Sequence, residues 1–293
     1  MKITGVTIIK NAVKNFYPVL ESIGSILPVV DEMIVSIGDS EDETEALINS
    51  IGSPKIKIVH STWDSNIRKG GSVLAVETNK ALEHIPADTD WIFYIQADEV
   101  VHEKYHQNIR RAAELFLHNK KVEGLLFRYV HFYGTYDYVI ESRRFYNYET
   151  RIIRNKRGIG SYKDAQGFRR GEKKLNVALI DAWVYHYGWV KSPGEMKQKQ
   201  KNVSRFWEEN DEALAKVLAS EGDFEFDDFE ALAKFSGTHP AIMQKRIEEK
   251  NWKLELDTSR KNFSLKDRVL FAIEKLTGKR LFSFSNHRIV AKM

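Results

Sequence analysis

The sequence predicts an α/β protein with a mostly parallel central sheet, flanked by helices and followed by a helical C-terminal extension. In the first hundred residues, β-rich runs alternate with stretches whose apolar residues recur at helical spacing. Such alternation implies right-handed crossovers and a parallel sheet covered on both faces. The chain has 293 residues, of which 42% are hydrophobic, so it is long enough to bury a sizeable core.

The expected elements follow one another in a regular order. Strands are expected at 3–9, 33–37, 56–59 and 91–95, and helices at 16–27, 41–51 and 73–82. Pro18 is acceptable in the first turn of its helix. Further strands are expected at 122–134, at 147–155 and within 179–190, where the strand ends at His186. From Ser192 onward helical spacing dominates, and the acidic segment EGDFEFDDFE separates two helical stretches.

Composition argues against several classes of protein. The net charge is only +4, with 45 basic and 41 acidic residues interspersed, which is unlike a dedicated nucleic-acid binder. There is no cysteine, so disulfides and thiolate metal sites are excluded, as suits a reducing cytosol. The first ten residues, MKITGVTIIK, predict a buried strand and not a signal peptide. No segment approaches the ~18 apolar residues that a transmembrane helix requires. We therefore expect a cytoplasmic protein.

The stretch DTDWIFYIQADEVVHEKY, residues 88–105, carries the first candidate site. Its apolar run from Trp91 to Ile95 stops at Gln96, and two adjacent carboxylates, Asp98 and Glu99, follow. In open parallel sheets, ligands bind beyond the carboxyl ends of the strands. A carboxylate there suits Mg²⁺ or Mn²⁺, which prefer oxygen ligands and often bridge to substrate phosphates. The alternative is that these acidic residues only begin a turn or cap the next helix.

A second candidate is SIGDSEDETEALI, residues 36–48, at the end of the second expected strand. Ser40 or Asp42 could simply cap the following helix. In the functional interpretation, Asp39 remains free to bond a base or ribose beside a helix N-terminus.

A third candidate is VYHYGWVKSPGEMKQKQK, residues 184–201. His186 is followed by Gly188 and by a set of lysines: Lys191, Lys197, Lys199 and Lys201. An imidazole ligand beside lysines that neutralise a diphosphate makes a coherent site. The alternative is a structural histidine followed by a solvated helix face.

Taken together, these segments resemble a family of known enzymes. GVTIIKN and SILPVVDEMIVSIGDSEDETEALI resemble the opening of a family 2 glycosyltransferase with the Rossmann-like GT-A fold. GGSVLAVETNKAL resembles its donor-site helix, and DTDWIFYIQADEV the strand that leads to its D-x-D motif. YETRIIRNKRGIGSYKDAQGFR and VYHYGWV resemble its acceptor-side segment and late histidine. The resemblance covers about the first 190 residues. It implies a catalytic domain at 1–190 and a mainly helical extension at 191–293.

The resemblance implies inverting transfer of a sugar from a nucleotide-diphospho-sugar donor to an acceptor hydroxyl, assisted by Mn²⁺ or Mg²⁺. Asp98 matches the metal-binding carboxylate that closes D-x-D, and His186 matches the late histidine as a second metal ligand. Gln96 stands at the opening position and is expected to contact the ribose side of the donor. Lys191 and Lys197 are expected to neutralise the diphosphate.

Two donor contacts depart from the family pattern. Where the family usually has its base-contacting Asp, this chain has Ile37, so Asp39 is the nearest substitute. Near Asn79, the expected donor contact in the third helix, the family often has an Arg, and here Thr78 stands instead.

The general base lies in the family's acceptor-side region, which makes Asp164 in YKDAQGF the first choice. Glu99 and Glu149 are the alternatives for this role. Asp164 could also be only a turn residue before Gly167.

Other functions also fit parts of the sequence. A non-catalytic nucleotide-sugar-binding protein would explain Gln96 as the mark of a decayed metal site. A nucleic-acid-binding protein would use the aromatic residues and the basic C-terminus, but we expect no nucleic-acid partner. A nucleotidyltransferase is disfavoured because no Gly-rich phosphate loop lies near the first strand.

The C-terminal segment SLKDRVLFAIEKLTG, residues 264–278, predicts a helix that begins after Ser264 and stops at Gly278. One apolar stripe follows its length, formed by Leu265, Val269, Ala272, Ile273 and Leu276. From Arg260 to the end there are nine basic and two acidic residues. The helix is expected to pack on the domain. The alternative is peripheral contact with the inner face of an anionic membrane, where a lipid-linked rather than a free saccharide acceptor would reside, as in cell-surface polysaccharide synthesis.

Overall fold

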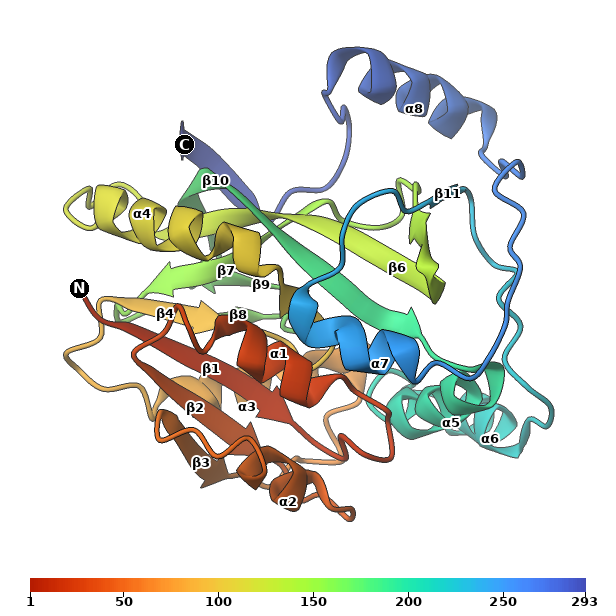
Figure 1. The fold of residues 1–293 in the computed structure, drawn as a ribbon, viewed down its shortest axis with the longest axis horizontal. Coiled ribbons are helices and arrows are strands. Elements are labelled where there is room, and N and C mark those ends of the chain that lie inside the picture. The colour runs from red at the N-terminus through yellow and green to blue at the C-terminus, as the bar shows by residue number, and fades with distance from the viewer.

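The structure is a computed structural model that describes residues 1–293, and it has the α/β architecture expected from the sequence (Figure 1). A curled mixed sheet forms its centre, in the order β3-β2-β1-β4-β7-β6-β10-β9-β8, with β5 and β12 paired to β10 and β11 paired to β6. The strands are β1 (Ile3–Ile9), β2 (Glu32–Ile37), β3 (Ile56–His60), β4 (Trp91–Tyr94), β5 (Glu99–Val101), β6 (Gly124–Ile140), β7 (Tyr148–Arg154), β8 (Ile159–Tyr162), β9 (Gly167–Arg170), β10 (Lys173–Val190), β11 (Leu232–Lys234) and β12 (His287–Lys292). The helices are α1 (Val19–Ile26), α2 (Thr44–Asn49), α3 (Ser72–Leu82), α4 (His106–Phe116), α5 (Pro193–Ser204), α6 (Asp211–Ala219), α7 (Gln244–Glu248) and α8 (Leu265–Thr277).

The first four strands form the parallel half of the sheet. β1 pairs in parallel with β2 and β4, and β2 with β3, which is the arrangement that strand–helix alternation predicts. Beyond β4 the sheet is mixed, because β7 runs antiparallel to both β4 and β6. The expected parallel pairing therefore holds throughout the strands that alternate with helices, whereas beyond β4 antiparallel pairs are mixed with the parallel pairs β6–β10 and β10–β12.

Helices cover both faces of this parallel half. Alternate residues of β4 point to opposite sides, so Trp91 and Phe93 pack in one core with α1 and α4, while Ile92 and Tyr94 pack in a second core with α3. Every residue of β1 and β4 is buried. This explains why β4 is a continuous apolar run in the sequence and why only a glycine and two small threonines interrupt β1.

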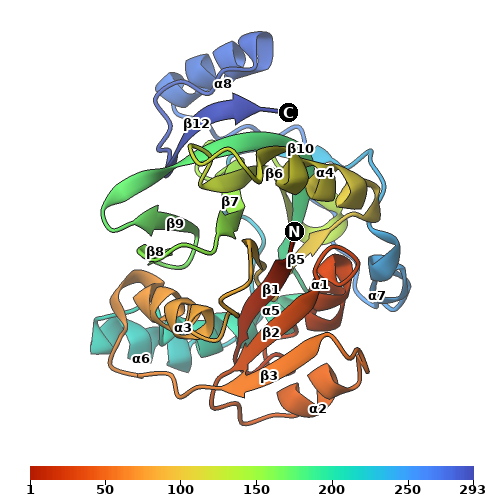
Figure 2. The ribbon, with the colours of Figure 1, turned by 90° about the vertical axis from the view of Figure 1, so that its left-hand side faces the viewer.

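The expected end of the last long strand at His186 is wrong. β10 continues to Val190 because its pairing with β6 continues past His186, with a register shift between His186 and Trp189. It also pairs antiparallel with β5, which places His186 opposite Glu99. Figure 2 shows β10 arching along the sheet, with β12 beside it. The C-terminal region is thus not purely helical, because β12 pairs in parallel with β10.

The C-terminal helix α8 has the expected ends and an unexpected orientation. The Ser264 hydroxyl accepts a hydrogen bond from the backbone N–H of Asp267, and Gly278 ends the helix in a left-handed conformation. The expectation that its apolar stripe packs on the domain is wrong, since Leu265 is 82% exposed and Leu276 is 86% exposed. None of the helices in the structure has the length and apolar character needed to cross a bilayer.

Candidate active site

A cleft of about 520 Å³ opens beyond the carboxyl ends of β1 and β4, at the sheet edge where the sequence places its candidate residues. Four of the predicted site residues line it: Gln96, Asp98, Asp164 and His186. Aromatic rings form much of the remaining wall, namely Tyr17, Trp63, Tyr94, Tyr146, Trp189, Phe206, Trp207 and Phe224. Flat rings of this kind stack on bases and on the apolar faces of sugars.

The turn after β4 presents the first carboxylate. The backbone N–H of Glu99 donates to the Gln96 carbonyl (3.0 Å), and the Gln96 N–H donates back to the Glu99 carboxylate (3.1 Å). The Asp98 carbonyl accepts from the Tyr187 N–H of β10 (2.8 Å). Because its backbone is fixed from two directions, Asp98 has a defined position at the cleft.

Asp98 lies within a group of basic side chains. Its Oδ2 is 3.3 Å from Lys199 Nζ and 3.7 Å from His186 Nε2. Burial acts to raise the pKa of Asp98, but the neighbouring His186, Lys199 and Lys191 outweigh burial and lower that pKa to about 2. Burial also lowers the pKa of His186, so at neutral pH Lys199 is the cation in contact with this carboxylate.

A hydrogen-bond chain fixes the tautomer of His186. His131 Nε2 lies 2.7 Å from the Tyr146 carbonyl, which can only accept, so this nitrogen carries the proton. Burial lowers the pKa of His131 to about 3, so its Nδ1 is unprotonated and accepts from His186 Nδ1 at 3.2 Å. The Nε2 of His186 is therefore left with a free lone pair, directed toward Asp98.

The space between Asp98 and His186 suits a cation. A neutral imidazole lone pair and a carboxylate face each other there, an arrangement that a positive ion between them stabilises. Gly188 keeps this space open, because a β-carbon at that position would lie 2.6 Å from Asp98 Oδ2 and 2.7 Å from His186 Nε2. No group of three or more ligand side chains surrounds the site, so the protein offers two ligands, and a bound diphosphate would have to supply others.

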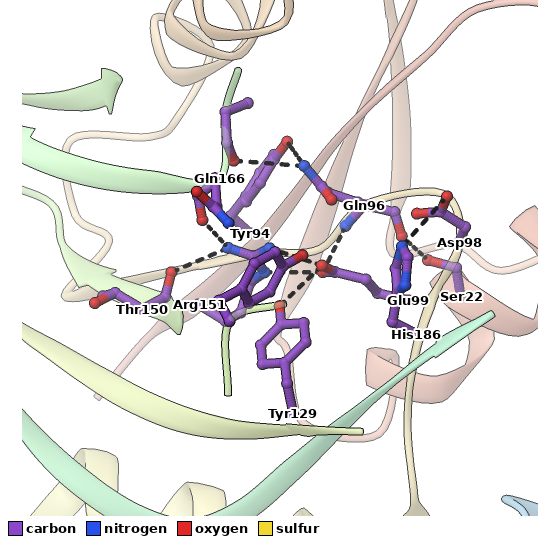
Figure 3. A network of polar contacts seen from close by, with 12 residues as sticks. Ser22, Tyr94, Gln96, Asp98, Glu99, Tyr129, Thr150, Arg151, Gln166 and His186 are labelled. Carbon is purple, nitrogen blue, oxygen red and sulfur yellow. Dashed lines mark hydrogen bonds and ion pairs between the residues drawn. The ribbon is translucent and has the colours of Figure 1, made fainter. Parts of the chain in front are cut away.

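The second carboxylate of the turn, Glu99, is engaged elsewhere (Figure 3). Arg151 donates Nε–H to Glu99 Oε2 (2.8 Å) and Nη2–H to Oε1 (2.7 Å), and both side chains are fully buried. The Tyr129 hydroxyl donates to the same Oε1 (2.8 Å). Glu99 does not line the cleft, so its carboxylate anchors the turn that carries Asp98 and is not placed to take a proton from an acceptor.

Another end of the cleft is built from β1 and the segment after β3. Lys10 Nζ lies 2.7 Å from Asp39 Oδ1, which also accepts from the Trp63 backbone N–H (3.0 Å). Burial acts to raise the pKa of Asp39, and these two donors outweigh it, so the pKa is lowered. Trp63 Nε1 is buried without a hydrogen-bond partner while its ring lines the cleft. This end therefore offers the Trp63 ring and the Lys10 side chain to a ligand, whereas Asp39 lies outside the cleft lining and the Trp63 Nε1 atom is buried beside Gly38.

A strained turn presents Asp164. It connects β8 to β9, and the residues on either side of Asp164, Lys163 and Ala165, both have positive φ, at 55° and 58°. This region is unfavourable for residues other than glycine, and such strain is common at functional sites. The Ala165 carbonyl accepts a long hydrogen bond from Gln96 Nε2 (3.4 Å), so this turn and the Gln96 turn are in contact.

Four predicted donor contacts do not line the cleft: Asp39, described above, and Asn79, Lys191 and Lys197. Asn79 binds the backbone of Ser161 through both its side-chain oxygen (2.7 Å) and its nitrogen (3.3 Å), which attaches β8 to α3. Lys191 is buried with no hydrogen-bond partner, and burial lowers its pKa well below the usual value. Lys197 lies on α5 outside the cleft lining and makes no ion pair.

Lys199 takes the place expected for Lys191 and Lys197, and the sequence contains a signal for it. Met196, Lys199 and Val203 stand three and then four residues apart, so they share one face of α5, and all three line the cleft. Helical spacing counted from the buried Met196 would have selected Lys199. Arg151 carried no comparable signal, because its partner lies 52 residues away.

Comparison with known proteins gives structural similarities only. No protein-family profile matches the chain, and no curated protein does. Among solved structures, TarS of S. aureus matches with a TM-score of 0.39 and 15% identity over 75% of this chain and 42% of that chain. The 1–349 portion of TarS in complex with UDP gives the same TM-score with 14% identity, over 75% of this chain and 70% of that one. Glucosyl-3-phosphoglycerate synthase from Mycobacterium tuberculosis, in complex with Mn²⁺, UDP and phosphoglyceric acid, matches with a TM-score of 0.31 and 19% identity, over 44% of this chain and 43% of that one.

Proposed function

We propose that the protein transfers a sugar, with inversion, from a nucleotide-diphospho-sugar donor to an acceptor hydroxyl. The observation that carries this proposal is the convergence of Asp98, the free Nε2 of His186 and Lys199 in one cleft at the carboxyl edge of the parallel strands. Sugar transfer of this kind requires stabilisation of the charge on a leaving diphosphate, and this set of groups provides it.

Asp98 and His186 would hold a divalent cation, either Mn²⁺ or Mg²⁺, in the space that Gly188 leaves open. Such a cation stabilises negative charge on a leaving diphosphate. Lys199 adds a positive charge at the same carboxylate. Lys191 does not line the cleft, and burial lowers its pKa well below the usual value, so Lys199 is the lysine that would act on the diphosphate.

The donor's nucleoside would occupy the end formed by Lys10, Asp39 and Trp63. The ring of Trp63 would contact the base, and Asp39, which lies outside the cleft lining, would orient Lys10 and Trp63 for that contact. Gln96, which lines the cleft and stands two residues before Asp98, would contact the ribose side. As an amide it contributes hydrogen bonds and no charge.

Asp164 would act as the general base. It lines the cleft on a turn that contacts Gln96, and its carboxylate has no hydrogen-bond partner in the protein. In the proposed step the acceptor oxygen attacks the anomeric carbon opposite the diphosphate, Asp164 takes the hydroxyl proton, and the bond to the diphosphate breaks. Glu149 does not line the cleft, and burial raises its pKa to about 8, so its carboxyl group is protonated at neutral pH and is not suited to this role.

The proposed function assigns a catalytic unit and an extension to the chain, and a compartment to the protein. Residues 1–190 would form the catalytic unit and residues 191–293 an extension, although α5 of that extension lines the cleft through Met196, Lys199 and Val203. The acceptor would be a saccharide, free or lipid-linked, and the protein would act in the cytoplasm.

A thermal-shift screen against nucleotide-sugars, with and without Mn²⁺, tests this function. A ligand at about a hundred times its Kd stabilises the folded state by about 2.7 kcal/mol, so a true donor raises Tm clearly. We expect the gain with donor and Mn²⁺ together to exceed the sum of the separate gains, because the diphosphate completes the coordination. Leu115→Ser, which replaces an exposed residue of α4 outside the cleft lining, serves as a control that retains the synergy.

Donor hydrolysis measured on the same samples separates two functions. Slow Mn²⁺-dependent release of free sugar supports a transferase. Donor binding without any turnover would instead support the non-catalytic nucleotide-sugar-binding protein, in which Gln96 marks a lost charge. Absence of binding to every nucleotide-sugar would overturn both.

A further inference from the structure

We propose that α8 and the segment after it form a docking surface for an anionic membrane. This surface, the C-terminal patch, consists of the exposed apolar side chains Leu265, Val269, Leu276, Phe282 and Phe284, and the basic residues around them. Membrane docking by this patch does not depend on the proposed sugar transfer. Only the inference that the acceptor is carried by a lipid rests on that function.

The apolar part of the patch is unusually exposed. Leu265 and Leu276 are 82% and 86% exposed, and Phe282 and Phe284 are 87% and 72% exposed. Leu265, Val269 and Leu276 stand four and seven residues apart and so share one face of the helix. Single exposed apolar residues are normal on a protein surface, whereas a helical face of this kind marks an interaction site.

The attachments of α8 explain why this face points outward. Glu274, on the opposite side of the helix, lies 2.6 Å from Arg143 Nη1 and 3.6 Å from Arg280 Nε. Lys275 forms an ion pair with Glu141. Figures 1 and 2 both show α8 at the outer end of the molecule, and Figure 2 shows it beyond β12. The polar side of the helix is fixed to the protein, and the apolar side is left free.

The charges around the patch identify its partner. Five basic residues of the C-terminal segment are exposed and form no ion pair: Lys266, Arg268, Lys279, Arg288 and Lys292. On the helix, Arg268 follows Leu265 by three residues, so it flanks the apolar face. An apolar face bordered by uncompensated basic residues is complementary to an anionic bilayer surface, where each such residue contributes roughly a fivefold gain in binding.

The patch lies near the turn that carries Asp164. The Nζ atom of Lys163 lies 5.7 Å from the centre of the Phe284 ring, and Lys163 is the neighbour of Asp164 in the strained turn. Asn286 accepts a hydrogen bond from Arg169 of β9 (2.7 Å), which attaches this segment to the strand that follows the turn. A membrane bound at the patch would therefore lie near the proposed general base, which favours an acceptor carried by a lipid.

Vesicle co-sedimentation tests the patch directly. The full chain is mixed with phosphatidylcholine vesicles that either contain or lack phosphatidylglycerol, at low and at raised salt. We expect binding that requires the anionic lipid and weakens with salt. Leu265→Ser/Leu276→Ser and Arg268→Gln/Lys279→Gln should each lower binding by roughly tenfold or more. Matched controls are Leu115→Ser on α4 and Lys216→Gln/Lys253→Gln, which replace exposed residues elsewhere and should leave binding unchanged.

Three results would overturn the proposal: no binding to either vesicle, equal binding to neutral and anionic vesicles, or equal losses in the patch variants and their controls. Analytical ultracentrifugation on the same samples identifies the competing occupant, because a dimer that the leucine variant converts to a monomer would assign the patch to a second copy of this chain. Nucleotide-sugar binding measured without vesicles should be the same in the patch variants and the wild type, so failure of membrane binding and failure of the donor proposal are observed separately.

Discussion

Replacing Glu99 by Gln tests whether the second carboxylate after β4 is structural. The substitution keeps the shape of the side chain and removes its charge, so the Arg151 guanidinium is left buried without its counter-ion. Removing one partner of a fully buried ion pair typically costs about 3–5 kcal/mol. The upper part of that range is expected here, because the two residues share two hydrogen bonds of 2.7 and 2.8 Å, and Tyr129 and the Gln96 N–H also donate to the carboxylate.

This loss converts to a measurable change in melting temperature. With an unfolding entropy of about 2.1 cal/mol/K per residue over 293 residues, about 3–5 kcal/mol lowers Tm by about 5–8 °C. Scanning calorimetry and urea unfolding provide the assay. Glu249→Gln is the matched control, because its partner Lys245 is 3.8 Å away and both side chains are largely exposed, and it should cost less than about 1 kcal/mol.

A double variant distinguishes the stability lost by leaving Arg151 unpaired from the stability that the Glu99–Arg151 ion pair itself contributes. Glu99→Leu/Arg151→Met removes both charges, so it should recover part of the stability that Glu99→Gln loses. The reasoning is refuted if Glu99→Gln melts like the wild type but has lost sugar transfer, since Glu99 would then act in catalysis.

Three shorter predictions concern the cleft and its surroundings. Gly188→Ala places a methyl group between Asp98 and His186, so the Mn²⁺-dependent part of the thermal shift should disappear while the protein remains folded; an unchanged Mn²⁺ response would place the metal elsewhere. Asp164→Asn should lower kcat by about 10²–10⁴-fold with little change in donor affinity, measured by transfer kinetics and titration, whereas full activity would exclude it as the base. Burial raises the pKa of Glu149 to about 8 from 4.5, so the folded state retains a proton that the unfolded state has released, and stability falls as pH rises through this window. Urea unfolding should therefore find Glu149→Gln less sensitive to pH between 5 and 8 than the wild type, and equal slopes would contradict this assignment.

The sequence predicted those elements whose bounds are set by interactions between residues close in the chain. The bounds of β1 match the expectation, and those of β2, β3, β4 and α3 differ from it by one residue, because apolar runs and helical spacing report burial directly. The ends of α8 were predictable from Ser264 and Gly278, since both act within their own turn. Its orientation was not, because the position of an apolar stripe does not reveal what covers it.

The candidate site was predictable only in part, for a related reason. Asp98 and His186 follow from strand ends and from the resemblance, and the structure brings them together in the cleft. The roles of the neighbouring groups depend on partners distant in sequence. Glu99 carries the same charge as Asp98 and lies next to it, yet Arg151 determines that it is buried and paired.

The central claim is tested most directly by sugar transfer from a donor found in the screen, measured across a Mn²⁺ titration for wild type and Asp98→Asn. The substitution preserves size and removes the charge that helps to hold the metal. We predict wild-type transfer that rises with Mn²⁺ and is abolished by EDTA, and a loss of about two orders of magnitude or more in a folded Asp98→Asn protein. Wild-type turnover in EDTA, or unchanged activity in Asp98→Asn, would contradict the account and leave Lys199 as the cation that receives the diphosphate charge.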